Sequence, residues 1–146
     1  GGNINATYLV GTAIQANYAD LAERFEADAL YPPGTVLAIG GTAEVTLEDQ
    51  ELSENVFGVI STAAGFILNG AAGSDLTHPQ IAVSGRVPVR VIGKVKKGDR
   101  LVSAGSGLAR AGAKNEITAF NVIGRSLENK LSDEEGVVTA IVKLNS

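Results

Sequence analysis

The chain contains no cysteine, methionine or tryptophan, and histidine occurs only once. Without cysteine the protein has no disulfides, no thiolate metal ligands and no cysteine nucleophile, so its stability must come from packing or assembly. Aromatic residues account for only 5% of the sequence, whereas glycine occurs 18 times in 146 residues. This composition favours strands joined by tight turns over a deep ligand pocket walled by aromatic rings. The absence of methionine also indicates a fragment or a processed product of a longer polypeptide.

Charge and long apolar runs are scarce as well. The 12 basic and 16 acidic side chains are spread along the chain and give a net charge of −4. No basic stripe is present to neutralise nucleic-acid phosphates, so we expect no nucleic-acid partner. No apolar run approaches the roughly 20 residues that span a bilayer, so we expect no membrane insertion. The length fits one domain with a single core.

One helical pattern is present, between residues 12 and 28. Its apolar side chains recur at spacings of four, three and four, with Thr12 as a possible N-cap and Pro32 after its end. The stripe consists of Ile14, Tyr18, Leu21 and Phe25. A stripe this narrow is typical of a coiled-coil seam, so it packs either on the domain's own sheet or on symmetry-related copies. We favour the second alternative, an oligomer interface.

The segment before this stripe, residues 1–11, is rich in Asn, Thr and Gly and has too little apolar surface to fold alone. It is expected to end a stalk or linker. The predicted organisation is therefore a stalk or linker with a short helix in residues 1–30, followed by a β-rich globular domain in residues 31–146.

After Pro33 the pattern changes to short β-branched runs bounded by Gly, Pro, Asn and Asp, which is typical of strands. The expected strands are residues 35–39, 44–47, 56–61, 80–95, 100–103, 119–123 and 137–144. In the longest run Val87, Val89 and Val91 alternate with more polar residues, which predicts one buried face. These runs predict an all-β fold, a small barrel or sandwich, preceded by the short N-terminal helix or stalk segment.

The β-rich part also contains an internal pseudo-repeat. Residues 33–41 lead, after a charged stretch, to a strand around Gly58, and residues 97–105 lead in the same way to a strand around Gly124. Each unit is interpreted as a turn, a strand, a Gly-rich turn, a second strand and a strand whose central glycine lets another backbone approach. The pattern predicts a pseudo-twofold β architecture; the alternative is a chance recurrence of turn glycines.

Several segments resemble structural and fibre proteins of tailed phages, especially myophages of marine and cyanobacterial hosts. The resemblance rests on ANYADLAERFEAD at 16–28, YPPGTVL at 31–37, SGRVPVRV at 84–91, VKKGDRLVS at 95–103 and VIGRSLEN at 122–129. It covers residues 16–144 and implies a virion structural protein, the terminal domain of a fibre or appendage. The implied partners are further copies of the chain in a homotrimer, other virion proteins and a host cell-surface receptor. Exposed loops at residues 47–55 and 70–78 are the expected host-contact surfaces.

Two further resemblances suggest other roles. The sequence is similar to the self-cleaving chaperone domains that end some phage neck-appendage proteins and that cut themselves away with acidic residues. The residues that match that motif in type and position are Asp20, Glu23 and Glu26. The Gly- and Asp-rich halves also resemble small head-decoration proteins, which implies a capsid role as the remaining alternative.

The candidate chemistry depends on Asp20 and Glu23. If they share a helix face, one carboxyl could remain protonated as a general acid while its partner activates water. The alternative is a solvated helix edge. The acidic runs at 48–51 and 133–135 lack the spacing of a calcium loop, and His78 alone cannot build a two-histidine site, so we expect no metal and no cofactor. Arg86 and Arg90 share one strand face, where they meet either solvent or carboxylates of a neighbouring subunit.

Overall fold

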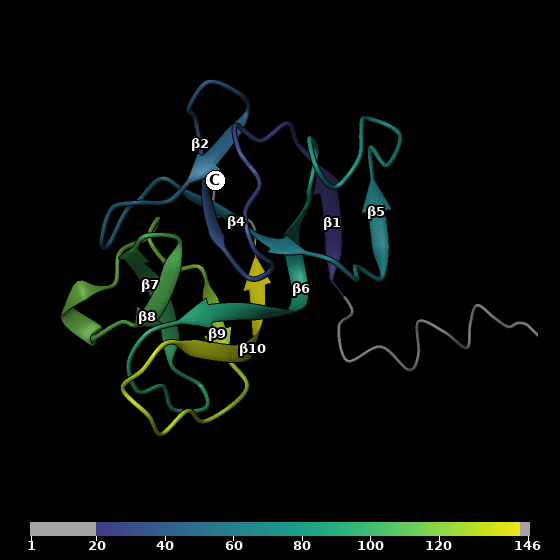
Figure 1. The fold of residues 1–146 in the computed structure, drawn as a ribbon. Coiled ribbons are helices and arrows are strands. Elements are labelled where there is room, and N and C mark those ends of the chain that lie inside the picture. Colours follow the sequence, from purple (N-terminus) through teal and green to yellow (C-terminus); the bar gives the residue numbers. More distant parts are fainter. Residues whose placement is uncertain (1–19, 144–146) are drawn as a thin grey trace, which may run out of the picture.

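The computed structural model describes residues 20–143, which form β-strands joined by short connections (Figure 1). The strands are β1 (Leu21–Arg24), β2 (Val36–Ile39), β3 (Val45–Leu47), β4 (Val56–Ser61), β5 (Phe66–Leu68), β6 (Gln80–Val91), β7 (Arg100–Gly105), β8 (Leu108–Ala111), β9 (Gly124–Ser126) and β10 (Gly136–Lys143). Within residues 20–143 the one helical element is a 3-10 turn, η1 (Lys114–Glu116), and no helix there is long and apolar enough to cross a membrane. The predicted all-β fold is confirmed.

Five strands close into a barrel in the order β6, β8, β7, β9 and β10. Strand β10 returns antiparallel to β6 along its whole length, from the pair Gly136–Val91 to the pair Lys143–Ser84. On the other side of β6 a short parallel contact joins Val91 to Ala109 of β8. Val87, Val89 and Val91 point into this barrel and are fully buried, as the alternation in the sequence predicted.

The N-terminal half of the described chain extends the sheet beyond the barrel. Strands β4, β2 and β3 continue from the first part of β6, while β1 pairs with the opposite edge of that part and carries β5 as an edge strand. Successive side chains of β2 point to opposite faces of the sheet and so enter different cores. Val36 lies in the barrel core, whereas Leu37 lies in a second, smaller core. The second core buries Leu37, Val45, Ile60 and Ile81. The domain is thus a barrel with a second core on its flank.

The pseudo-repeat predicted from the sequence is visible in the strand pairing. In the first unit β2 lies between β3 and β4, and Leu37 is opposite Gly58. In the second unit β7 lies between β8 and β9, and Leu101 is opposite Gly124. The glycines allow close backbone approach, because a Cβ atom at Gly124 would lie 2.2 Å from the carbonyl oxygen of Ile141 in β10.

The turns that open the two units match as well. Gly34 has a φ of 84° and its N–H donates to the Ile60 carbonyl at 2.9 Å. Gly98 has a φ of 93° and its N–H donates to the Ser126 carbonyl at 2.7 Å. Such positive φ angles favour glycine over residues with a side chain. The same turn therefore starts both halves of the domain.

The expected N-terminal helix is wrong for residues 20–28, and residues 12–19 lie outside the described part. Residues 21–24 form β1, and Ala27 bridges Val45 of β3. Leu21 and Phe25 are four residues apart, which places them on one face of a strand as well as on one face of a helix. The pairing partners β5 and β6 therefore decide the conformation. The division at residue 30 stays a prediction.

Two strand predictions also need correction, and two strands were not predicted. The strand expected at residues 80–95 ends at Val91. Residues 119–123 form no strand, because the Asn121 side chain accepts from Thr118 N–H and donates to the Glu116 carbonyl, which holds a local turn. Strand β8 was not predicted; it forms a hairpin with β7 through Ser106 and Gly107, whose φ angles of 56° and 74° suit a two-residue hairpin turn. Strand β5 was also missed.

Candidate oligomer interface and buried acid

An apolar edge strand is exposed at the side of the domain. Strand β5 pairs only with β1 among the described strands, and it leaves its other edge unpaired. All of its side chains are exposed: Phe66 by 65%, Ile67 by 38% and Leu68 by 41%. In Figure 1, β1 and β5 stand side by side, apart from the β7–β8 hairpin. An exposed apolar edge of this kind is a ready template for pairing with another chain.

Local hydrogen bonds hold β5 against β1. The Asp20 carbonyl accepts from Gly65 N–H at 3.0 Å and from Phe66 N–H at 3.3 Å. At the other end of β5 the Asn69 side-chain amide donates to the Arg24 carbonyl at 3.2 Å. Hydrogen bonds at both of its ends therefore fix the position of β5 beside β1.

The loop that follows β5 is tied to the same strand. The Arg24 guanidinium donates to Asp75 and to the His78 carbonyl, each at 2.7 Å. Leu76, between these two residues, is 70% exposed. The loop at residues 70–78 is thus anchored at its C-terminal part and presents an apolar side chain beside the edge strand.

Asp20 is buried at the start of β1. It is only 1% exposed, and its carboxylate oxygens form no hydrogen bond of good geometry within residues 20–143, although the Ser61 hydroxyl is a polar neighbour. Burial raises the pKa of Asp20, and the nearby Ser61 hydroxyl partly offsets this by favouring the charged form. A carboxyl with a raised pKa stays protonated at higher pH than an exposed one, and a protonated carboxyl can act as a general acid.

The other predicted acidic residues do not join Asp20. Because residues alternate across a strand, Asp20 and Glu23 lie on opposite faces at β1, so the expected shared helix face is absent. Glu23 is half-buried opposite Ile81 and Leu68. Glu26 is exposed, and its backbone N–H and carbonyl bond to Glu44. The structure therefore isolates Asp20 from its expected partners.

The predicted seam is divided by the structure. Ile14 and Tyr18 lie outside the described residues, and Leu21 is half-buried on β1. Phe25 packs against the second core and meets Phe57 edge-to-face, with ring centroids 5.0 Å apart and planes at 85°. Phe25 thus has an intramolecular partner, while the assignment of the seam to an oligomer interface stays a prediction.

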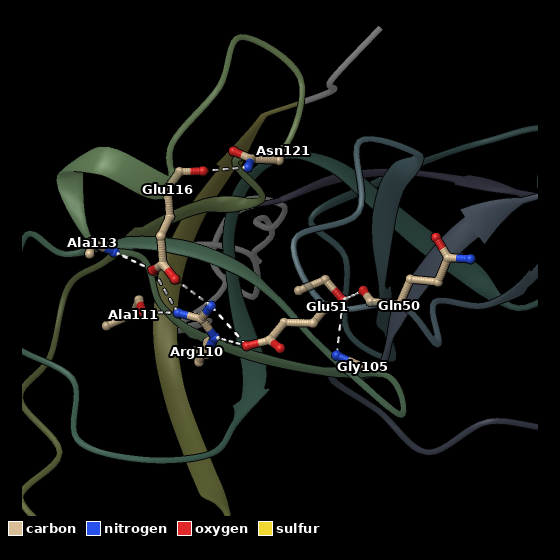
Figure 2. Close-up of polar contacts among 9 residues, drawn as sticks. Gln50, Glu51, Gly105, Arg110, Ala111, Ala113, Glu116 and Asn121 are labelled. Carbon is tan, nitrogen blue, oxygen red and sulfur yellow. Dashed lines mark hydrogen bonds and ion pairs between the residues drawn. The ribbon is translucent and has the colours of Figure 1, made fainter.

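The loop at residues 47–55 is held to the second half of the barrel. Its Glu51 carboxylate accepts from Arg110 of β8, and its Gln50 carbonyl accepts from Ser103 of β7 at 2.7 Å (Figure 2). Arg110 also donates to both carboxylate oxygens of Glu116, and this ion pair lowers the pKa of Glu116 to about 2. The loop joins the two halves of the domain.

The two arginines of β6 differ in their contacts. Arg90 donates to Glu135 at 2.7 Å and to the Thr35 hydroxyl at 3.0 Å, within the same chain. Arg86 is exposed, and no hydrogen bond or ion pair of its side chain occurs in the described part. Across residues 20–143, no group of three or more His, Cys, Asp or Glu side chains is placed to hold a metal ion.

Comparison with solved structures places this arrangement of strands among phage proteins. The pre-mature gene product 12 of bacteriophage phi29 aligns with a TM-score of 0.63 and 17% identity over 88% of this chain. Its C-terminal fragment aligns with a TM-score of 0.58 and 19% identity, over 85% of this chain and 100% of the fragment. The folds are alike.

The present chain spans only 22% of the pre-mature gene product 12 chain. The base of the phi29 head fibre gp8.5 aligns with a TM-score of 0.46 and 16% identity, over 86% of this chain and 91% of that one, which is too low to establish a common fold. No protein-family model and no curated protein matches the sequence. The likeness to gene product 12 therefore concerns the fold.

Strand β5 is the part of the candidate interface that sequence reasoning missed. Phe66, Ile67 and Leu68 are consecutive and apolar, so they show neither the alternation of a half-buried strand nor a helical period. A signal was nevertheless present, because a short apolar run between Gly65 and the Asn69–Gly70 pair is bounded by turn residues on both sides.

Proposed function

We propose that this chain is the terminal domain of a phage fibre or appendage, where it promotes homo-oligomerisation within the virion. The observation that carries the proposal is the exposed apolar edge of β5, which a second copy would cover. The fold shared with gene product 12 of phi29 supports a virion role. The resemblance to fibre proteins built around threefold axes favours a trimer.

The edge has the properties of an interface in one copy of the chain. Phe66 exposes 65% of its surface, and apolar residues of this size seldom line an unpaired edge without a partner. Natural proteins protect such edges with charges or proline, and β5 contains neither. Burial of this edge by another copy would stabilise the assembly by roughly 1.5–3 kcal/mol for each large apolar side chain that becomes fully covered.

Light scattering on the 146-residue chain tests the proposal. We expect a stable oligomer for the wild type and dissociation for Phe66→Lys. The matched control is Ile39→Lys, which places the same charge on an apolar side chain that is 48% exposed at the end of β2. A monomeric wild type, or equal dissociation by both variants, would contradict the assignment of β5 to the interface.

Contact with the host surface would involve the loop at residues 70–78, where Leu76 is 70% exposed. The loop at 47–55 is less suited because Gln50 and Glu51 are engaged by the barrel. Phage particles that carry a replaced 70–78 loop are expected to adsorb poorly to their host. Normal adsorption of those particles would exclude this loop as the contact.

A second function, self-cleavage, is favoured by one specific observation, the burial of the Asp20 carboxyl beside the Ser61 hydroxyl. A precursor extended at its N-terminus is the appropriate substrate, and its fragments are resolved by gel electrophoresis. If Asp20 acts as the general acid, Asp20→Asn stops the precursor from splitting, while Glu26→Gln, at an exposed site, leaves splitting intact. If the wild-type precursor forms trimers and is still not cleaved, self-cleavage is wrong.

A further inference from the structure

A groove of about 750 Å³ lies on the outside of the barrel, beside β7, β9 and β10. Its cationic lining consists of Lys97, Arg100, Arg125 and Lys143, and no acidic residue lines it. The whole chain carries a net charge of −4, so the groove has the opposite sign of charge from the chain as a whole. The groove therefore suits an anionic occupant.

The two arginines of the groove are placed at a cost to stability. Arg100 of β7 and Arg125 of β9 are directly opposite one another in the antiparallel register. Like charges at directly opposed positions destabilise a strand pair. Neither arginine has an ion pair in residues 20–143, whereas Arg24 and Arg90 each have one and Arg110 has two.

The groove also has an apolar side. Ile141 of β10 lies opposite Arg125 of β9 and is 42% exposed. Val122 and Leu127 also belong to the apolar lining. A free inorganic anion would leave these side chains in water. The best-matched occupant therefore brings carboxylates together with an apolar side chain.

The loop between β9 and β10 presents that combination. Leu131 is 85% exposed, and the exposed carboxylates of Asp133 and Glu134 have no ion pair among the described residues. Lys130 holds the loop in shape, because its ammonium donates to the carbonyls of Gly93, Ser132 and Glu134. A loop held in this way loses little conformational freedom when it binds. We call residues 131–134 the acidic protrusion.

The acidic protrusion of one copy lies far from the arginine end of its own groove. It precedes Gly136 at the start of β10, whereas Arg125 pairs with Ile141 near the end of that strand. At about 3.3 Å per residue, these positions are separated by roughly 17 Å along the strand. The other end of the groove is closer, because the Lys97 N–H donates to Asn129 of the same loop. Contact between the protrusion and the arginine end therefore requires two chains and is head-to-tail, the type of contact that closes into a ring when the rotation allows it.

We propose that the acidic protrusion of one copy docks into the cationic groove of the next copy, with Leu131 on the apolar side and Asp133 and Glu134 beside the arginines. This proposal rests on the proposed homo-oligomerisation and names a second surface for it, distinct from β5. Charge complementarity sets the direction of the contact and hence the register of the copies.

A double-mutant cycle on the 146-residue chain tests the docking. Arg100→Glu in the groove and Glu134→Lys in the protrusion are each expected to weaken association at least 10-fold, as measured by light scattering over a concentration series. Because the combined variant restores opposite charges, we expect it to associate more tightly than either single variant. Lys143→Glu is a second groove variant, since that side chain is exposed.

The control is Lys114→Glu, an equal charge change at an exposed lysine of η1 that belongs neither to the groove nor to the acidic protrusion, and it should leave association unchanged. Circular dichroism establishes that each variant is folded. If the wild type is an oligomer that neither the groove nor the protrusion variants weaken, the docking is wrong while oligomerisation stands. If the wild type is a monomer, both proposals are wrong.

Discussion

Arg110 of β8 forms a bidentate ion pair with Glu116 of η1, with both nitrogen–oxygen distances at 2.9 Å. The same guanidinium reaches Glu51 at 2.9 Å, so one side chain joins the neighbouring η1 to the 47–55 loop, which is distant in sequence. The Glu116 carboxylate additionally accepts from the Ala113 N–H. This cluster links the 47–55 loop of the first half to the second half of the domain.

The first prediction concerns acid stability. The pKa of Glu116 is lowered from 4.5 to about 2 in the folded protein, so its contribution to stability is present above pH 4.5 and is lost as the pH falls toward 2. Glu116→Gln should lower the free energy of unfolding at neutral pH, and the difference from wild type should shrink between pH 4.5 and 2. Denaturant unfolding at several pH values measures this. A difference that is constant with pH would contradict the prediction.

The second prediction concerns the close strand crossing. Gly124→Ala would place a methyl group 2.2 Å from the Ile141 carbonyl oxygen, and backbone atoms cannot move away cheaply. We expect destabilisation of about 3 kcal/mol in chemical denaturation, in the upper range for overpacking. Gly70→Ala is the matched control, because its Cβ would meet only Ile67 at 3.7 Å. Equal stability of the two variants would show that β9 and β10 do not approach in this way.

The third prediction concerns Asp20. Its folded-state pKa is raised above 3.8, so ionisation favours the unfolded state, and stability falls as the pH rises from 3.8 through the folded-state pKa. Asp20→Asn should remove this fall, and its stability relative to wild type should increase with pH over that interval. Ser61→Ala should shift the fall to higher pH, because the hydroxyl favours the charged carboxyl. Thermal melts over a pH series measure these differences in stability. If the stability of wild type and of Asp20→Asn changes with pH in parallel, the raised pKa of Asp20 is wrong.

The fourth prediction concerns the second core. Phe25 and Phe57 meet edge-to-face, so Phe25→Ala and Phe57→Ala should be coupled by about 1 kcal/mol in a double-mutant cycle. Each single variant should also cost about 2–3 kcal/mol, somewhat below a fully buried phenylalanine, because both rings are only partly buried. Additive effects would show that the two rings do not touch in solution.

The sequence predicts much of the barrel because β-branched alternation and turn glycines act locally. The Gly34 and Gly98 turns, together with Gly58 of β4 and Gly124 of β9, are visible in the sequence and locate both pseudo-repeat units. The N-terminal strand was misassigned because the four-residue spacing between Leu21 and Phe25 satisfies a strand and a helix equally. Only the pairing of β1 with β5 and β6 distinguishes these alternatives.

The candidate surfaces were harder to predict because they depend on pairing between distant residues. Arg100 and Arg125 are 25 positions apart, and only the register of β7 and β9 brings them together. The position of Asp20 likewise involves distant residues, because its carbonyl accepts from the N–H groups of Gly65 and of Phe66 in β5. Its residue type made Asp20 a candidate acid in the sequence. Its separation from Glu23 follows from the strand conformation of β1, which the sequence did not predict.

Strand β6 belongs to both parts of the domain, and β10 is the partner that closes the barrel around it. A ribosome must therefore deliver residue 143 before the barrel can close, and a nascent chain that stops before Gly136 leaves eight positions of β6 without their partner. Such non-local pairing is slow and leaves an incomplete chain exposed to aggregation. Only chains translated past β10 can therefore form the closed barrel.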